Sequence, residues 1–487
     1  MLRIEVRGAV SKVIEVKPVT RIEGHAKIKI WLDEEGNVKD AHFHVLEVRG
    51  FERFLIGRPI EEAPLIVPRI CGICYTCHHL ASAKAVDAYF GLQPEDLPET
   101  ANMLRELMLM GNFIHSHSLH FYALAAPDFI VGPDADPRER NLVGVIKKAP
   151  EIAKNAIRLR AVGIKITEIV GGKAVHPVTA IPGGVSKGLT EEERQKLLPD
   201  VKWAIEFSKE TVELCKQLMD RYSDLVKNIG VLRTYHLGLV GNQGVHQLYH
   251  GNLRFVDPDG NVAAEFPYDQ YLDYIAERVE EYSYLKFPYF KKAGWPSGVY
   301  RVNTLSRLNV ADKMPTPLAQ EYFEELRRTW GKPIHNTLLY NLGRCIELLE
   351  CAERSLELLE NPKITGPNLR VPVKPRSGEG IGVVEAQRGT LIHHYAADAE
   401  GLITDSNIIV ATVQNNPAFD RLMCEESKKF IKGGQVNEGL LNRLEMLIRA
   451  YDPCLSCATH TIAGHYPLVI EVVDDKDRLI AKLSNLE

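Results

Sequence analysis

Cysteines at metal-binding spacings lie near both ends of the chain. Cys71 and Cys74 form a CxxC pair within the segment RICGICYTCH, and Cys454 and Cys457 form another within DPCLSCATH. A CxxC spacing allows two thiolates to converge on one metal ion. Thiolates are soft ligands, which suit zinc, nickel, copper(I) or iron–sulfur centres and not magnesium or calcium. Four such sulfurs therefore predict a metal site, if the fold brings the two ends of the chain together.

Three kinds of metal centre fit these cysteines. A zinc ribbon separates its two CxxC pairs by about 15–20 residues. Here almost the whole chain lies between the pairs, so only a remote structural zinc site is compatible with them. A ferredoxin-type cluster could use Cys71, Cys74 and Cys77, but the fourth cysteine followed by proline that this pattern requires is missing after His78. The third alternative is a catalytic metal held by both ends of the chain.

The composition is that of an ordinary globular protein. The 487 residues are 45% hydrophobic and 25% charged, and the net charge is -5. Proteins dedicated to nucleic acid normally carry a basic surplus, so we expect no nucleic-acid partner. No apolar run approaches the roughly 18 residues of a membrane helix, and the N-terminal segment lacks a hydrophobic signal core. We therefore expect no membrane partner and a cytoplasmic location.

Hydrophobic periodicity predicts one large, helix-rich α+β unit. Apolar and polar residues alternate within the first 50 residues, notably around Ile28, Ile30 and Leu32, which predicts an N-terminal antiparallel β region. Longer amphipathic stretches predict helices. The expected helices are residues 78–92, 97–124, 143–170, 190–229, two within 317–361, those of 417–451, and a short one at 479–483. Strands are expected within 380–412 and at 468–473, and a loop at 127–142.

The two cysteine motifs, written RxCGxCxxxH and DPCxxCxxH, resemble those of the large subunit of nickel–iron hydrogenases. Four further segments agree with the same family in type and order: Arg21-Ile22-Glu23-Gly24-His25, Arg49-Gly50-Phe51-Glu52, His120-Phe121-Tyr122 and Glu385-Ala386-Gln387-Arg388-Gly389. The resemblance spans about residues 14 to 460, and it implies the hydrogenase large-subunit fold for residues 1–460. Residues 461–487 would be a C-terminal extension, which in similar proteins a maturation endopeptidase removes after the histidine corresponding to His460.

The resemblance implies a role for each cysteine of the two pairs. Cys71 and Cys454 would bind nickel as terminal thiolates. Cys74 and Cys457 would bridge the nickel to an iron that also carries carbon monoxide and cyanide.

Other motif residues would surround this centre. His78 would form a hydrogen bond near a bridging sulfur, as an outer support of the metal site. Arg388 would place its guanidinium over the open face of the metals, with Asp452 as its neighbour. Glu52 and His460 resemble the ligands of a second site that holds magnesium or iron.

The implied activity is the reversible heterolytic cleavage of dihydrogen. The proton would pass to Cys454 or Arg388 and then outward through Glu23, because a buried carboxyl group suits proton transfer. The catalytic residues implied in this way are Glu23, His78, Arg388, Asp452 and Cys454. Electrons would leave through the iron–sulfur clusters of a partner small subunit, since no complete iron–sulfur motif is left over in this chain. The acceptor module beyond it would be a heterodisulfide reductase, a flavin subunit or an NAD(P) subunit.

Some positions depart from the family's common pattern. Ser116 stands where many relatives have aspartate, Gln387 where proline is common, and Ala411-Thr412 where a Pro-Ser/Thr pair is common. These residues are similar to those found in the cytoplasmic, multimeric hydrogenases. They favour the methanogen-like type, which does not reduce deazaflavin. An NAD(P)- or deazaflavin-coupled enzyme is the alternative.

Two interpretations without this catalysis stay open. A non-catalytic relative, such as the quinone-binding subunit of respiratory complex I, lacks the cysteines that this chain retains. A structural zinc protein would keep them. Cys77 lies between the motifs and is expected to be a packed thiol, because free cysteine is commonly buried.

Overall fold

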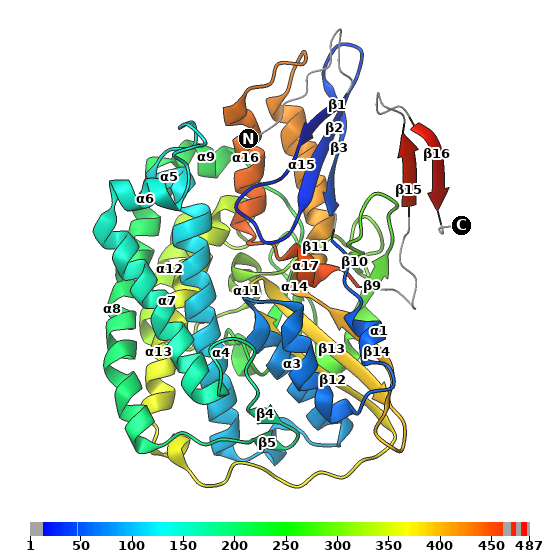
Figure 1. Cartoon of the computed structure of the whole chain (residues 1–487). Helices are drawn as coiled ribbons and strands as arrows, with labels where there is room; N and C mark the ends of the chain where they lie inside the picture. Colours follow the sequence, from blue (N-terminus) through cyan, green and yellow to red (C-terminus); the bar gives the residue numbers. More distant parts are fainter. Residues whose placement is uncertain (1–12, 46, 461–468, 474–478, 485–487) are drawn as a thin grey trace.

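The computed structural model describes residues 13–45, 47–460, 469–473 and 479–484 (Figure 1). The helices and strands before residue 460 share one dominant hydrophobic core, so the prediction of a single helix-rich α+β unit is confirmed. Among the described residues, no helix combines the length and the apolar character that a bilayer crossing requires.

The N-terminal β region is a three-stranded antiparallel sheet, as predicted. Its strands β1 (Val13–Val16), β2 (Ala26–Leu32) and β3 (Val38–Val45) follow one another in space in chain order. Alternate side chains of β2 are buried, because successive residues of a strand point to opposite faces. Helix α15 (Asn416–Phe430) packs against β3 and covers the sheet. The strand character expected for residues 1–12 lies outside the described residues.

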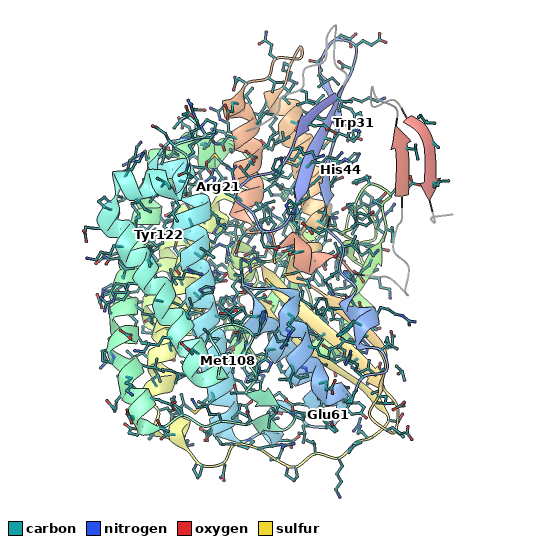
Figure 2. The ribbon with its side chains drawn as sticks, viewed as in Figure 1. Arg21, Trp31, His44, Glu61, Met108 and Tyr122 are labelled. Atoms are coloured by element: carbon teal, nitrogen blue, oxygen red, sulfur yellow. The ribbon has the colours of Figure 1, made fainter. Side chains whose placement is uncertain are left out.

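Long helices form a layer on the left of the molecule in Figure 1. Helix α4 (Glu99–Leu119) packs on α7 (Pro150–Gly171) and on α13 (Tyr340–Glu360), and α13 packs on α8 (Glu191–Arg221). Side chains fill the space between these helices and the rest of the fold (Figure 2). The layer matters for function because α4 and α13 carry buried polar residues toward the site described below.

The boundaries of three predicted helices were wrong. The helix expected over 190–229 is divided at Tyr222 into α8 and α9 (Ser223–Asn228). The helix expected over 143–170 is divided into α6 (Leu142–Lys148) and α7, because Pro150 has no N–H with which to continue α6. The helix expected over 97–124 is α-helical only to Leu119 and then continues as a π-helical turn, His120–Ala125.

Two further predictions need correction outside the long helices. The loop expected over 127–142 begins with the short helix α5 (Pro127–Ile130). The short helix expected at 479–483 is instead strand β16 (Leu479–Ser484), which pairs antiparallel with β15 (Val469–Val473). So short a segment gains little from helix formation in isolation, whereas pairing with a neighbouring strand satisfies its backbone.

An alanine-rich helix rests directly on a second sheet. Helix α3 (Tyr75–Tyr89) packs on β12 (Gly378–Ala386) and β13 (Gly389–Ala397), which pair antiparallel, and β14 (Ile403–Ile409) completes the sheet. This packing places the start of α3, where the first cysteine pair lies, near the tight β12–β13 turn that carries Arg388.

The close contact of α3 with the sheet depends on glycine. A Cβ atom at Gly382 would lie 2.1 Å from the carbonyl oxygen of Ala81 and 2.3 Å from the backbone nitrogen of Ala85. We expect Gly382→Ala to lower the free energy of unfolding by about 3 kcal/mol, at the upper end for overpacking. Thermal and denaturant unfolding would measure it, with Gly50→Ala as control because nothing lies within 4 Å of a Cβ there. Equal stability of the two variants would contradict this account.

The remaining elements connect these layers. The other helices are α1 (Phe51–Leu55), α2 (Ala63–Ile66), α9 (Ser223–Asn228), α10 (Tyr271–Tyr274), α11 (Thr304–Val310), α12 (Pro317–Trp330), α14 (Ala411–Gln414), α16 (Glu438–Ala450) and α17 (Leu455–Ala458). The other strands are β4 (Ala180–Ile181), β5 (Gly184–Val185), β6 (Tyr235–Val240), β7 (Asn252–Val256), β8 (Val262–Phe266), β9 (Ile275–Arg278), β10 (Phe287–Phe290) and β11 (Tyr300–Arg301).

Candidate metal centre

The sulfurs of the two cysteine motifs meet inside the protein. The Sγ atom of Cys71 lies 3.5 Å from that of Cys454, and the Sγ of Cys74 lies 3.9 Å from that of Cys457. The sulfurs of Cys454 and Cys457 are 2.7 Å apart, and all four lie within 4.8 Å of one another. All four side chains are buried. We call these four cysteines the sulfur quartet. The fold thus brings the two ends of the chain together, as the predicted metal site requires.

The first motif presents its sulfurs from a turn before α3. A short 3-10 helix, Val67–Ile70, leads into Cys71, and α3 begins directly after Cys74. The backbone N–H groups of Ile73 and Cys74 donate to the Sγ of Cys71, with N···S distances of 3.2 and 3.3 Å. The turn is therefore built to support negative charge on that sulfur.

The charge of the quartet is unevenly distributed. Hydrogen bonds from the thiols of Cys454, Cys457 and Cys74 hold the pKa of Cys71 well below its usual range. Burial raises the pKa of Cys454 and of Cys457 well above the usual range. Without a metal, Cys71 is therefore the preferred thiolate, and a cation would be needed to ionise Cys454 and Cys457.

The second motif is held in place by the N-terminal segment. Glu23 forms a parallel bridge with Cys454: its N–H donates to the carbonyl of Pro453, and its carbonyl accepts from the N–H of Leu455. The N–H of Cys454 donates to Oγ1 of Thr412 at 3.1 Å. Residues far apart in sequence thus fix the backbone on both sides of this ligand candidate.

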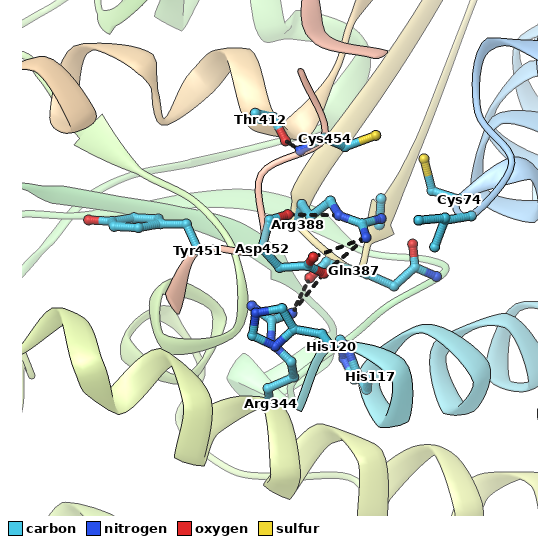
Figure 3. A network of polar contacts seen from close by, with 12 residues as sticks. Cys74, His117, His120, Arg344, Gln387, Arg388, Thr412, Tyr451, Asp452 and Cys454 are labelled. Atoms are coloured by element: carbon cyan, nitrogen blue, oxygen red, sulfur yellow. Dashed lines mark hydrogen bonds and ion pairs between the residues drawn. The ribbon is translucent and has the colours of Figure 1, made fainter. Parts of the chain in front are cut away.

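Arg388 lies beside the sulfur quartet, between Cys454 and Cys74 in Figure 3. Its Nε donates to the backbone carbonyl of Asp452 at 2.8 Å, and its Nη2 lies 3.0 Å from the Asp452 carboxylate. Arg344 approaches the same carboxylate at 3.7 Å. The structure therefore brings Arg388 and Asp452 together, as the sequence predicts.

The protonation of this pair follows from its surroundings. Burial disfavours the charge of Arg388, but the attraction of Asp452 and of the cysteine sulfurs outweighs it and raises the pKa of Arg388 well above its usual range. Burial raises the pKa of Asp452, against the opposing effect of Arg388 and Arg344. The Nη1 of Arg388 has no hydrogen-bond partner among the described residues. A buried guanidinium with an unused donor beside the quartet fits a centre that binds a further group.

Glu23 is close to the quartet but is not fully buried. Its carboxylate accepts hydrogen bonds from the hydroxyl and from the N–H of Ser456, a residue of the loop between Cys454 and Cys457. The side chain is half-buried in the isolated chain, which corrects the expectation of a buried carboxyl group. The reason is its position on the N-terminal segment, at an edge of the core.

His78 has a different observed partner from the one predicted. Its Nδ1 lies 3.0 Å from Nε2 of His393, and Nδ1 of His393 lies 2.5 Å from the hydroxyl of Tyr395. Burial lowers the pKa of His78 to about 3, so the ring is neutral. Its Nε2 has no partner among the described residues, and its hydrogen bond to a sulfur stays a prediction.

Glu52 and His460 contact different residues. Nε2 of His460 lies 2.5 Å from Oε1 of Glu277, whereas one carboxylate oxygen of Glu52 accepts from Arg49 at 2.9 Å and the other has no partner among the described residues. Burial lowers the pKa of Lys286 to about 8, while nearby Glu277 and Glu52 oppose the shift. Lys286 is therefore close to both carboxylates, and the second candidate metal site stays a prediction.

Several polar residues around the site could not be predicted from the sequence. Glu277, Arg344 and His393 lie in segments where no motif was recognised, and only the fold brings them to the centre. Ser116, which replaces a common aspartate, is buried, and its hydroxyl has no hydrogen-bond partner among the described residues. No local pattern could have identified these contacts, since each joins elements distant in the chain.

The donor set fits nickel and iron. Four buried sulfurs are soft ligands of the kind that nickel and iron accept in proteins. A structural zinc site closed by four cysteines has the same ligands, but it has no use for an unpartnered guanidinium beside it. The buried Arg388 thus favours a reactive centre over a closed structural one.

Comparisons with known proteins agree with this geometry. A family described as nickel-dependent hydrogenase matches residues 49–140 and 240–460, and a family described as HoxL-like matches residues 13–48. One subunit of the F420-non-reducing hydrogenase of Methanothermobacter thermautotrophicus is 50% identical over 474 residues, which cover 96% of this chain and 99% of that protein. The beta subunit of the NAD-reducing hydrogenase HoxS of Cupriavidus necator is 40% identical, over 96% of this chain and 99% of that one.

A solved structure shows the same fold. The crystal structure of an NAD+-reducing [NiFe]-hydrogenase in the H2-reduced state superposes with a TM-score of 0.89 at 39% identity, covering 93% of this chain and 100% of that chain.

Proposed function

Because the chain belongs to the nickel-dependent hydrogenases and corresponds to their large subunit, we propose that the sulfur quartet holds a nickel–iron pair. Cys71 and Cys454 would hold the nickel as terminal ligands, and Cys74 and Cys457 would be shared between nickel and iron. The iron would also carry carbon monoxide and cyanide. The observation that carries this proposal is the convergence of four buried sulfurs from the two ends of the chain within 4.8 Å.

The protein's own groups handle the proton of dihydrogen. When bound, the metal pair acts as a Lewis acid that makes heterolytic cleavage of dihydrogen feasible. The proton passes to the Cys454 sulfur, with Arg388 as the alternative base. Support for Cys454 comes from its position beside Arg388, whose guanidinium its sulfur attracts.

Arg388 and Asp452 act as a unit beside the reacting sulfur. The carboxylate and the backbone carbonyl of Asp452 hold two sides of the guanidinium, which leaves Nη1 for the reacting group. His78 would form a hydrogen bond near a bridging sulfur through its unpartnered Nε2, and would thereby orient that sulfur.

Glu23 receives the proton on its way to the surface. Its backbone lies alongside Cys454, and its carboxylate binds Ser456 of the same loop. Its half-buried position supports transfer between the interior and the solvent or a partner subunit.

A second metal site completes the centre. Glu52 and His460 would bind magnesium or iron there, and Glu277 is a further carboxylate in reach of His460. The unpartnered oxygen of Glu52 supports a role as a ligand. Residues 461–487 are removed by a maturation endopeptidase after His460.

Electrons leave through an iron–sulfur small subunit. The two relatives named above are subunits of multi-subunit enzymes, which supports such a partner. We propose a heterodisulfide reductase as acceptor, which is the acceptor expected for the methanogen-like type that the sequence resembles. The greater similarity to the F420-non-reducing relative supports this type. A flavin or NAD(P) module is the alternative, and the complex is located in the cytoplasm.

The purified holoenzyme tests this function. We expect one nickel per large subunit with iron in excess of nickel, because the partner's clusters also contain iron. We further expect dihydrogen-dependent reduction of a viologen dye and infrared bands of metal-bound carbon monoxide and cyanide. Stoichiometric zinc without nickel or iron would contradict the proposal and establish a structural site. A metal-free chain that binds quinone would establish a non-catalytic relative.

A further inference from the structure

A third cysteine of the first motif lies next to the quartet but outside it. Cys77 is fully buried in α3, one helical turn after Cys74. Its Sγ lies 3.4 Å from Oε1 of Gln387 and 3.7 Å from Oδ1 of Asn112. Both amides are themselves buried, on the β12–β13 turn and on α4. A thiol this close to a metal site is a potential competing ligand, so its exclusion needs a physical cause.

The direction of the hydrogen bonds around Cys77 is fixed by one backbone carbonyl. The oxygen of Ile73 can only accept, so the group that approaches it at 2.9 Å must be Nδ2 of Asn112. Oδ1 of Asn112 therefore faces the other way and accepts from Nε2 of Gln387 at 2.8 Å. This leaves Oε1 of Gln387 facing the sulfur of Cys77. The orientation of both amides thus follows from the contact with Ile73.

Two carbonyl oxygens consequently face the Cys77 sulfur. Each is an acceptor, so the sulfur must provide the hydrogen. A thiolate at this position would face the negative ends of two carbonyl dipoles and would be repelled by them. Burial acts in the same direction and raises the pKa of Cys77 well above its usual range. Packing alone, which was the role expected for Cys77, therefore does not account for its two contacts with amide oxygens.

The same amides also hold the metal loop and the arginine turn. Ile73 lies between Cys71 and Cys74, and its carbonyl is fixed by Asn112. Gln387 directly precedes Arg388, and its backbone oxygen accepts from Arg344 at 3.0 Å. One buried network therefore connects the first ligand turn, α4 and the guanidinium.

We infer that Asn112 and Gln387 are positioning residues that keep Cys77 as a protonated thiol and thereby limit the first motif to two metal ligands, Cys71 and Cys74. The inference rests on the proposed function of the quartet. It extends that function by naming what selects the ligands among three neighbouring cysteines.

The test compares variants of the holoenzyme by nickel content and by the electron paramagnetic resonance spectrum of nickel. Gln387→Leu removes both hydrogen bonds of the amide, and we expect about a 10-fold loss of nickel, as for other outer supports of metal sites, with an altered spectrum. Asn112→Asp should act similarly, because it places an oxygen against the Ile73 carbonyl. Cys77→Ser keeps a hydroxyl donor and should keep the wild-type nickel content and spectrum.

A double variant separates ligand selection from a structural effect. If Cys77 becomes a competing ligand in Gln387→Leu, then adding Cys77→Ala should restore nickel content and the original spectrum. Cys215→Ala, which removes a buried thiol from α8, is the matched control and should restore nothing. Should Gln387→Leu fail to fold, Gln387→Ala replaces it, since the smaller side chain removes the same carbonyl oxygen and N–H donor without crowding the core.

Two results would overturn the inference. One is a wild-type nickel content and spectrum in Gln387→Leu, and the other is failure of Cys77→Ala to restore them. Failure of the proposed function looks different: the wild-type protein would then lack nickel, or Cys71→Ser would leave its nickel unchanged.

Discussion

Replacing Cys454 by serine should abolish hydrogen oxidation while the fold persists. The serine oxygen is a hard donor that stays protonated at neutral pH, so it is a poor ligand for nickel. Cys454 is fully buried and lies within hydrogen-bonding distance of two other sulfurs of the quartet. Loss of a residue that only supports a ligand already lowers metal affinity or activity by about 10–100-fold. We therefore expect loss of a ligand to reduce dihydrogen-dependent dye reduction by more than about 100-fold. Nickel per chain should fall in parallel.

The matched control for this variant is Cys215→Ser. Cys215 is a buried thiol of α8, so it has the same chemistry and burial without belonging to the quartet. Both variants should show comparable melting temperatures, and only Cys454→Ser should lose nickel and activity. Retention of stoichiometric nickel and of activity in Cys454→Ser would refute the assignment of this sulfur as a ligand.

The ligand candidates could be predicted from the sequence because they lie in short local motifs. Cys71, Cys74, Cys454 and Cys457 each belong to a spacing with a known chemical use, and the structure brings their sulfurs together. Arg388 and Asp452 also meet as predicted.

The residues that hold these ligand candidates and their neighbours in place could not be predicted in the same way. Asn112 contacts Ile73 and Gln387, and His393 contacts His78, across separate elements. A side chain's partner across such distances depends on the tertiary fold, which no periodicity describes. The exposure of Glu23 likewise depends on how the N-terminal segment packs.

The fold could be predicted where one period dominates a segment. The helix expected over 190–229 begins as predicted, at a capping box in which Thr190 and Glu193 bind each other's backbone, and α8 continues to Arg221. After a break at Tyr222 the chain forms the separate helix α9, which the prediction did not include. The prediction failed at the break before Pro150, where apolar periodicity continues across two helices. It also failed at β16, where six residues are too few to distinguish a helix from a strand.

Changing Arg388 to lysine should reduce turnover without removing the metals. The lysine ammonium keeps the positive charge, but its three donors share one nitrogen and cannot reproduce the planar fork that holds the carbonyl and the carboxylate of Asp452 and directs Nη1 to the centre. Loss of one preorganised donor in a buried site costs about 100- to 1,000-fold in turnover, or about 2.7–4 kcal/mol. We expect a decrease of this size in dihydrogen-dependent dye reduction per nickel, with nickel content unchanged.

Arg105→Lys is the control for this change. Arg105 is another buried arginine that forms an ion pair with an aspartate, since its Nη1 lies 2.6 Å from Asp87, but it binds the backbone near β4 and β5 rather than the quartet. Both substitutions disturb a buried guanidinium, so both should lower the melting temperature. Only Arg388→Lys should change turnover per nickel, because only its guanidinium has an unpartnered nitrogen beside the sulfurs. Equal turnover per nickel in the two variants would show that Arg388 stabilises the fold and takes no part in the reaction.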